Sequence, residues 1–191
     1  MRVLLSLLLM LSALAAAQSL DVRGELPQGA GLVRYRIRRL PVNAFPELPA
    51  RVADELEARA CLIPQSYQAH GPENVIHGSF ERAGSKDWAV LCEAHGTVAL
   101  LVFFASNPAE PMTLAAAPET ERLQRHDASG ELGFDWGIDA ATPEQVHVAQ
   151  AGMERRPARP DHDALSDTLI DHRTIYHFFT RNAWQVLPVS E

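Results

Sequence analysis

The sequence of 191 residues is poor in lysine: Lys86 is the only lysine, against 16 arginines. The imbalance, together with the many alanines, is typical of the codon usage of a GC-rich genome and carries no functional signal. Acidic residues are in excess, and the formal net charge is −7. A net acidic chain is a poor candidate for binding nucleic acid or anionic lipid. We therefore expect neither of these two partners.

Long hydrophobic runs are also scarce. The only one, Val3–Leu14, follows Arg2 and precedes a run of alanines that ends at Ala17. A positive start, an apolar stretch and small residues form the secretory signal pattern, and this stretch is too short for the roughly 20 residues that span a bilayer. We predict that residues 1–17 are a signal peptide and that the mature chain starts at Gln18. There is no cysteine near this junction, so a lipoprotein is not expected. No later apolar run is long enough to predict a transmembrane segment. The expected location is the periplasm or the medium.

Cysteine is limited to Cys61 and Cys92. In an oxidising compartment an even pair indicates a disulfide. The two residues are not in the C-x-x-C arrangement of redox-active pairs. We predict that they are bonded, with Cα atoms roughly 4.4–6.8 Å apart.

Recognisable catalytic motifs are missing. The sequence contains no G-x-S-x-G, S-x-x-K or H-E-x-x-H pattern, and no two histidines have the i, i+4 spacing that places them on one helix face. A zinc site or a catalytic histidine cluster is therefore not indicated, and the catalytic residues, if there are any, are unknown. The eight histidines are His70, His77, His95, His126, His147, His162, His172 and His177.

The remaining chain divides into an extended N-terminal arm at 18–45 and a single domain at 46–191. Alternation over Leu32–Arg38 indicates one strand within the arm. In the domain, apolar residues recur every fourth position over Pro49–Ala60 and predict an amphipathic helix that delivers Cys61 to the core. A capping box at Thr142 with a following proline predicts a second, short helix ending near Met153.

The other apolar segments alternate with polar turns and predict strands. We expect an α+β domain, with a mainly antiparallel sheet, about two packed helices and one disulfide. Ser106–Glu119, which contains three prolines, is expected to be a loop. The expected strands are Asn74–Phe80, Asp87–Cys92, Thr97–Ala105, Leu132–Trp136, Thr168–Asp171, Thr174–Phe179 and Ala183–Val189.

Two segments share a layout of an acid-anchored turn followed by two apolar strands. In the first, the spacing of Gly78, Phe80, Gly84 and Asp87 resembles the FG-GAP or VCBS repeat, a propeller hairpin written G-D-F-N-G-D-G-x-x-D. Positions 79, 81 and 83 carry Ser, Glu and Ala where that repeat has calcium ligands. The chain is too short for a whole propeller. The stretch 74–92 is similar to uncharacterised secreted bacterial proteins, and this likeness implies a compartment without implying an activity.

The second segment keeps three carboxylates at ligand-like spacing: Asp161, Asp163 and Asp167. Calcium takes six to eight oxygen ligands, and closely spaced carboxylates on one turn supply several. The glycine that helps such a loop bend is replaced by Ala164. Two interpretations stay open, a calcium site or a solvated turn in which an aspartate caps the next strand. No other cofactor is expected.

Large aromatic residues are few, so their positions are informative. Trp88 precedes an apolar strand and is the tryptophan that we most expect in the core, ahead of Trp136 and Trp184. Each repeat-like segment ends in a Phe-Phe pair, 103–104 and 178–179. Adjacent strand residues point to opposite faces, so both members of the first pair are buried only if the strand is covered on both sides.

The preferred interpretation is an exported bacterial domain without enzymatic activity, which binds another protein or a component of the cell envelope. The alternative is a small extracytoplasmic hydrolase, with or without a metal, that uses some of Asp161, His162, Asp163 and His172. A converging pocket with shifted carboxylate pKa values favours the enzyme, and a flat apolar patch favours the binder.

Overall fold

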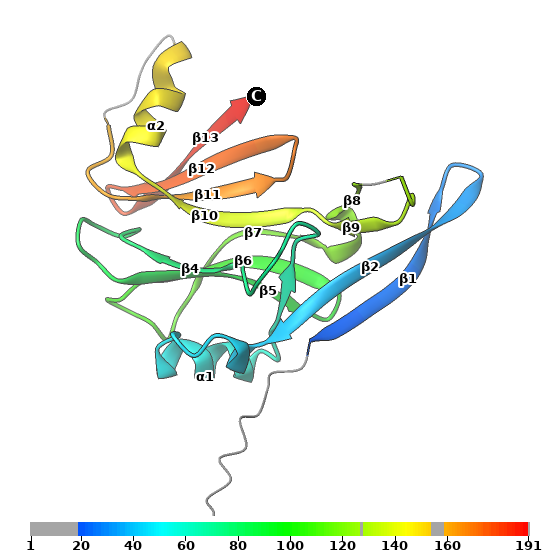
Figure 1. Ribbon diagram of the computed structural model, residues 1–191. Helices are drawn as coiled ribbons and strands as arrows, with labels where there is room; N and C mark the ends of the chain where they lie inside the picture. The colour runs from blue at the N-terminus through cyan, green and yellow to red at the C-terminus, as the bar shows by residue number, and fades with distance from the viewer. Residues whose placement is uncertain (1–18, 127, 154–158, 191) are drawn as a thin grey trace, which may run out of the picture.

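The strand segments assemble into two β-sheets that face each other, and one α-helix covers the outer side of each (Figure 1). The structure is a computed structural model that describes residues 19–126, 128–153 and 159–190. The predicted fold class is confirmed, since the structure is mainly antiparallel sheet with two α-helices in its described part and one disulfide. The expected signal peptide, 1–17, lies outside the described residues.

The first sheet has nine strands in the order β7-β6-β5-β3-β2-β9-β8, with β1 paired to β2 and β4 paired to β5. All pairs are antiparallel except β2 with β9. Its strands are β1 (Leu20–Gln28), β2 (Gly31–Pro41), β3 (Leu62–Gln65), β4 (Val75–Gly78), β5 (Asp87–Ala94), β6 (Thr97–Phe103), β7 (Met112–Pro118), β8 (Leu123–Arg125) and β9 (Leu132–Phe134).

The second sheet is a four-stranded antiparallel meander in the order β10-β11-β12-β13. Successive strands are neighbours because each connection but the first is a short turn. Between β10 and β11 the chain forms α2 (Pro143–Ala149), whose predicted capping box at Thr142 is present. The strands are β10 (Trp136–Ala141), β11 (Ala164–Leu169), β12 (Arg173–Thr180) and β13 (Ala183–Ser190).

Helix α1 (Ala50–Ala58) closes the outer face of the first sheet. Its apolar face buries Val52 and Leu56, as the four-residue spacing predicts. The helix is followed by Cys61, which is buried and bonded to Cys92 on β5 with a Cα–Cα distance of 5.1 Å. The predicted disulfide is confirmed, and it ties the end of α1 to the centre of the sheet.

Strand β6 lies between two apolar layers. Leu101 and Phe103 pack on the α1 side, whereas Leu100 and Val102 pack toward the second sheet. All four are nearly inaccessible. The strand is therefore covered on both sides, as its uninterrupted apolar sequence predicts.

The tryptophans differ from expectation. Trp136, at the start of β10, is fully buried between the sheets, while Trp88 and Trp184 are half-buried. The ring of Trp88 contacts the ring of His77. The expected ranking was wrong because it used only the apolar sequence that follows each tryptophan.

Several segments were misjudged from the sequence, and β3, β8 and the part of β10 after Trp136 were not predicted. The expected loop Ser106–Glu119 contains β7, and the strand expected at Thr168–Asp171 is instead β11, which ends at Leu169. The expected N-terminal arm contains a second strand, β1, that pairs with β2 along its whole length. The base of β2 also pairs with β3 and β9, so the described part of this arm, residues 19–45, provides both a projecting ribbon and part of the sheet (Figure 1).

Candidate functional site

A cleft of about 550 Å³ opens where the chain crosses from the first sheet to the second. The crossing residue is Asp135, which lies between the last residue of β9 and the first of β10. Its amide donates to the carbonyl of Arg122 (3.0 Å), and its carbonyl accepts from the amide of Ile170 (2.9 Å). These backbone bonds fix Asp135 to both sheets, so its carboxyl group is held in a defined place.

The carboxyl group of Asp135 lines this cleft although the residue is only 4% exposed. Burial raises the pKa of the Asp135 carboxyl to about 6, in spite of the opposing positive charge of Arg122 and a smaller effect of His172. Loss of water disfavours the charged form of a carboxyl group, which is the cause of this shift. The residue can thus change its charge near neutral pH.

Arg122 forms the opposite part of the site. Its guanidinium group lies over the ring of Trp136, 4.0 Å from the ring centroid. Such cation–π stacking holds the flat group in one plane. Within the described structure the buried Nε of Arg122 has no hydrogen-bond acceptor, and the buried Oδ1 of Asp135 has no donor. A donor and an acceptor, both buried beneath the lining of the cleft, are therefore unpaired.

The rim of the cleft is charged and balanced in sign. Glu121 and Arg122 come from the segment before β8. His172 comes from the turn between β11 and β12, and Arg173 is the first residue of β12. This turn is anchored by the Tyr67 hydroxyl, which donates to the Asp171 carboxylate at 2.6 Å. Burial and then this bond raise the pKa of Tyr67, so the hydroxyl keeps its proton. The bond from Tyr67, which follows β3, therefore helps to hold His172 at the cleft.

The three aspartates predicted to bind calcium have different partners. Asp161 bonds to His162, Asp163 accepts from the amide of Ser79 at 3.0 Å, and Asp167 accepts from the indole of Trp136 at 2.7 Å. Asp167 also lies inside β11 rather than in the turn before it. Throughout residues 19–126, 128–153 and 159–190, no three His, Cys, Asp or Glu side chains are grouped as a metal site. Calcium binding at this segment stays a prediction.

Asp161 and His162 form a pair of their own. The Oδ1 of Asp161 lies 2.7 Å from the Nδ1 of His162, and this hydrogen bond lowers the pKa of Asp161. The imidazole is buried, and its Nε2 has no partner within the described structure. Both residues line a second cavity, of about 740 Å³, which also has apolar walls from Phe178 and Leu187.

A second aspartate–histidine pair lies between the sheets. Asp167 is 3.2 Å from the Nε2 of His177, and both side chains are buried. Neither residue lines the cleft or the second cavity. Since Asp167 also accepts from Trp136, this group satisfies buried polar atoms and fixes β10, β11 and β12 to one another.

Of the four residues expected for a hydrolase, the structure brings Asp161 and His162 together and places His172 at the other cleft. Sequence reasoning missed Asp135 and Arg122. The signal that could have indicated Asp135 is its charge inside the apolar segment Leu132–Ile138, of which Leu132–Trp136 is predicted to be one strand. Arg122 had no local signal, because its partner Trp136 is distant in sequence.

Comparison with protein-family models, with curated proteins and with solved structures returned no match for this chain. None of the helices in the described ranges has the length and the hydrophobicity that crossing a bilayer requires.

Proposed function

We propose that this chain is an exported binding protein and that the cleft beside Asp135 is its ligand site. The observation that carries the proposal is the unpaired Oδ1 of Asp135 together with the unpaired Nε of Arg122. A buried polar atom without a partner costs about 1–3 kcal/mol. Both atoms are buried beneath the lining of the cleft, so a ligand reaches them when the two side chains turn toward it. A ligand that then supplies one donor and one acceptor removes both costs, and this is a source of affinity.

The chemistry of the cleft favours a neutral ligand with an amide group. An amide N–H complements the carboxylate of Asp135, and the amide C=O complements the Nε–H of Arg122. The rim carries carboxylates and guanidinium groups in equal number, Glu121 and Asp135 against Arg122 and Arg173. A net charge on the ligand therefore gains little, and peptide or N-acetyl groups of the cell envelope fit this pattern.

Export is part of the proposal. It is supported by the signal pattern of residues 1–17 and by the disulfide between Cys61 and Cys92, because disulfides persist in oxidising compartments. The intact mass of the protein recovered from the cell envelope or the medium tests it. A chain that starts at Gln18 is expected, and an exported chain that retains residues 1–17 contradicts the signal assignment.

The ligand site is tested by an NMR titration with N-acetyl-L-alanine methylamide, a small neutral diamide. We expect the Arg122 Nε–H signal to shift and saturate at millimolar probe, and acetate, which has no N–H donor, to shift it much less. Asp135→Ala removes the acceptor and should abolish saturation, whereas Asp139→Ala, at an exposed position on β10, should not. Equal responses of the two variants, or no response of the wild type, contradict the proposed site.

A second function is favoured by one specific observation, the pairing of Asp161 with His162. A histidine whose Nδ1 is held by a carboxylate and whose buried Nε2 has no hydrogen-bond partner in the described structure has the arrangement of a general base. In this hydrolase, His162 takes a proton from water, and the resulting hydroxide attacks an ester carbonyl in the second cavity. Asp161 stabilises the imidazolium that forms.

Release of p-nitrophenol from p-nitrophenyl acetate tests the hydrolase. His162→Gln should lower the rate at least about 100-fold, because general base catalysis contributes about 10²–10⁴-fold. His70→Gln, at an exposed position, controls for the reaction of imidazoles with this ester in general. Equal rates in both variants contradict a catalytic role of His162.

A further inference from the structure

Strand β1 has an open edge. Among the described residues it pairs with β2 alone, while β3 and β9 occupy the opposite edge of β2. The ribbon of β1 and β2 projects beyond the rest of the sheet (Figure 1). An open strand edge presents unpaired N–H and C=O groups to any strand that fits it.

The hairpin turn determines which groups face outward. Residues Gln28 and Gly31 close a two-residue turn, in which Gly29 has a φ of +61°. The residues that close such a turn are hydrogen-bonded to each other, and hydrogen-bonded pairs alternate with non-bonded pairs along the ladder. Asp21, Arg23 and Glu25 therefore direct their backbone groups away from β2, toward the open edge.

We propose that the open edge of β1 pairs antiparallel with the same edge of a second copy, with Gly24 on the two-fold axis. In this register Arg23 lies opposite the partner subunit's Glu25, and Glu25 lies opposite the partner subunit's Arg23. All nine residues of β1 overlap, because Gly24 is the middle residue of Leu20–Gln28. The outward-facing residues meet one another, as an antiparallel ladder requires.

Charge selects this register over its neighbours. A shift of the centre to Arg23 places the two Arg23 side chains opposite each other and Asp21 opposite the partner's Glu25. Like charges directly opposite are destabilising in a sheet. A shift to Val22 restores opposite charges but pairs only Leu20–Gly24. The register centred on Gly24 alone combines full overlap with two attractive Arg–Glu pairs.

The other face of the ribbon is apolar and also matches itself. Val22 lies opposite the partner's Leu26 in the proposed register, and cross-strand aliphatic pairs stabilise sheets. Val22 and Leu26 are half-buried in the single chain. The proposed sheet brings each of them against an aliphatic side chain of the second copy.

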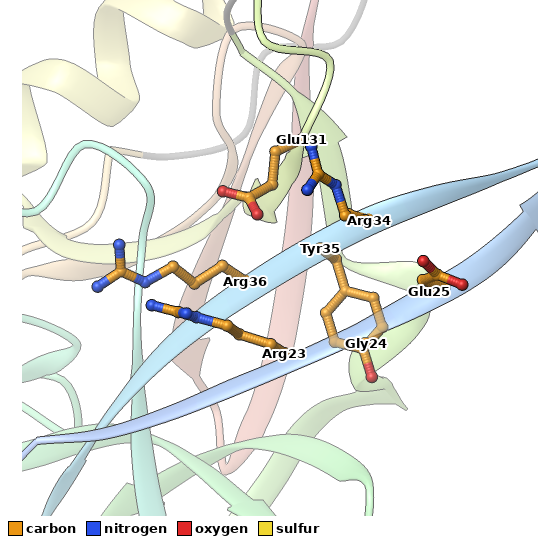
Figure 2. Close-up of a pocket in the computed structure, with 7 residues that line it drawn as sticks. All are labelled: Arg23, Gly24, Glu25, Arg34, Tyr35, Arg36 and Glu131. Carbon is orange, nitrogen blue, oxygen red and sulfur yellow. The ribbon is translucent and has the colours of Figure 1, made fainter.

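The centre of the interface is already filled. Figure 2 shows the Tyr35 ring reaching from β2 across Gly24, with the side chains of Arg23 and Arg36 extending together away from that ring. A Cβ atom at position 24 would lie 2.6 Å from the Tyr35 ring. The ring therefore replaces the missing side chain of Gly24 on the apolar face, where the two copies meet.

Pro27 limits the pairing at its end. Proline has no N–H to donate, and edge strands commonly use it to stop further addition. It lies opposite the partner's Asp21, so the ladder ends there. The geometry is a closed two-fold dimer, in which both open edges are used.

Sedimentation velocity across micromolar concentrations tests the interface. Wild type should change from a monomer to a species of twice the mass as concentration rises. Arg23→Glu and Glu25→Arg each place like charges opposite one another, and each should raise the dimer dissociation constant at least about tenfold. Arg51→Glu, an exposed charge reversal on α1, should leave the constant unchanged.

Mixing the two monomeric variants is the decisive experiment. A chain with Arg23→Glu presents two glutamates, and a chain with Glu25→Arg presents two arginines, so a one-to-one mixture should form a heterodimer. The double variant, Arg23→Glu with Glu25→Arg, should dimerise like wild type. The proposal is overturned if wild type stays monomeric, if the single variants dimerise normally, or if the mixture does not associate.

Discussion

Asp135 shows how a single residue acquires a shifted pKa without any unusual sequence context. Its backbone bonds to Arg122 and Ile170 hold the chain in place, and the carboxyl group is therefore kept in a buried position. A carboxyl group whose folded pKa is raised, here to about 6 from 3.8, favours the folded state when it is protonated.

The stability of the protein should therefore depend on pH through this residue. The contribution of protonated Asp135 is complete below a pH of about 3.8 and is lost as the pH rises through about 6. Asp135→Asn cannot ionise, so its melting temperature should exceed that of wild type above this range and come close to it below. Thermal melts across pH check this, and Asp139→Asn should follow wild type. Parallel curves for Asp135→Asn and wild type show an ordinary pKa.

Asn74 also joins the two sheets, and no local sequence pattern distinguishes it. Its side-chain amide donates to the carbonyls of Pro64 and Trp136, and its Oδ1 accepts from the amide of Ile138. Its φ of +67° is in the left-handed region, which asparagine tolerates better than most residues. The residue was expected only as the start of a strand, because long-range hydrogen bonds leave no local pattern.

Asn74→Ala leaves three buried backbone groups without partners. We expect it to lower the free energy of unfolding by at least about 3 kcal/mol, since each such group costs about 1–3 kcal/mol. Asn107→Ala, in an exposed loop, should change it by no more than about 0.5 kcal/mol. Chemical denaturation measures both, and similar values for the two variants contradict the bridging role.

At the scale of elements, a central strand is easier to predict than an edge strand. β6 was evident because an apolar run without a polar face fits only a strand covered on both sides. β7, with the sequence MTLAAAP, was missed because its alanines lack a clear strand signal and prolines lie beside it. β1 was missed because glycine, proline and charges break its alternation.

The two members of the first Phe-Phe pair should differ in their effect on stability. Phe103 is 1% exposed, whereas Phe104 follows β6, is half-buried and contacts Phe179 and Trp184. Phe103→Ala should cost about 3–5 kcal/mol, the usual range for a buried phenylalanine, and Phe104→Ala should cost less. Denaturant titration of both variants gives the comparison. A larger loss for Phe104→Ala contradicts the described packing of β6.

The disulfide should stabilise the link between α1 and β5. Replacing Cys61 and Cys92 together by alanine should lower the free energy of unfolding by about 3–4 kcal/mol, because the bond closes a loop of 31 residues in the unfolded chain. Reduction of wild type should have the same effect, and the double variant should not respond to reductant. A response of the double variant to reductant, or none of wild type, contradicts this role.

At the scale of the whole molecule, composition and periodicity predicted the α+β class, both helices and most strands, but not their division into two sheets. The chain passes from one sheet to the other at Asp135, which separates β9 from β10 inside an apolar segment that predicts one strand. Each sheet buries its inner face on the other through residues far apart in sequence, such as Ile37, Leu100 and Leu165. The cleft exists because of this division, so it was not predictable from local patterns.

The most direct test of the proposed ligand site is the pKa of Asp135 itself, followed by NMR of its carboxyl carbon with and without the diamide probe. Without probe the pKa should be about 6. With saturating probe it should fall, because an amide N–H that donates to Oδ1 stabilises the charged form. An unshifted pKa in the free protein, or one that the probe leaves unchanged, contradicts the account.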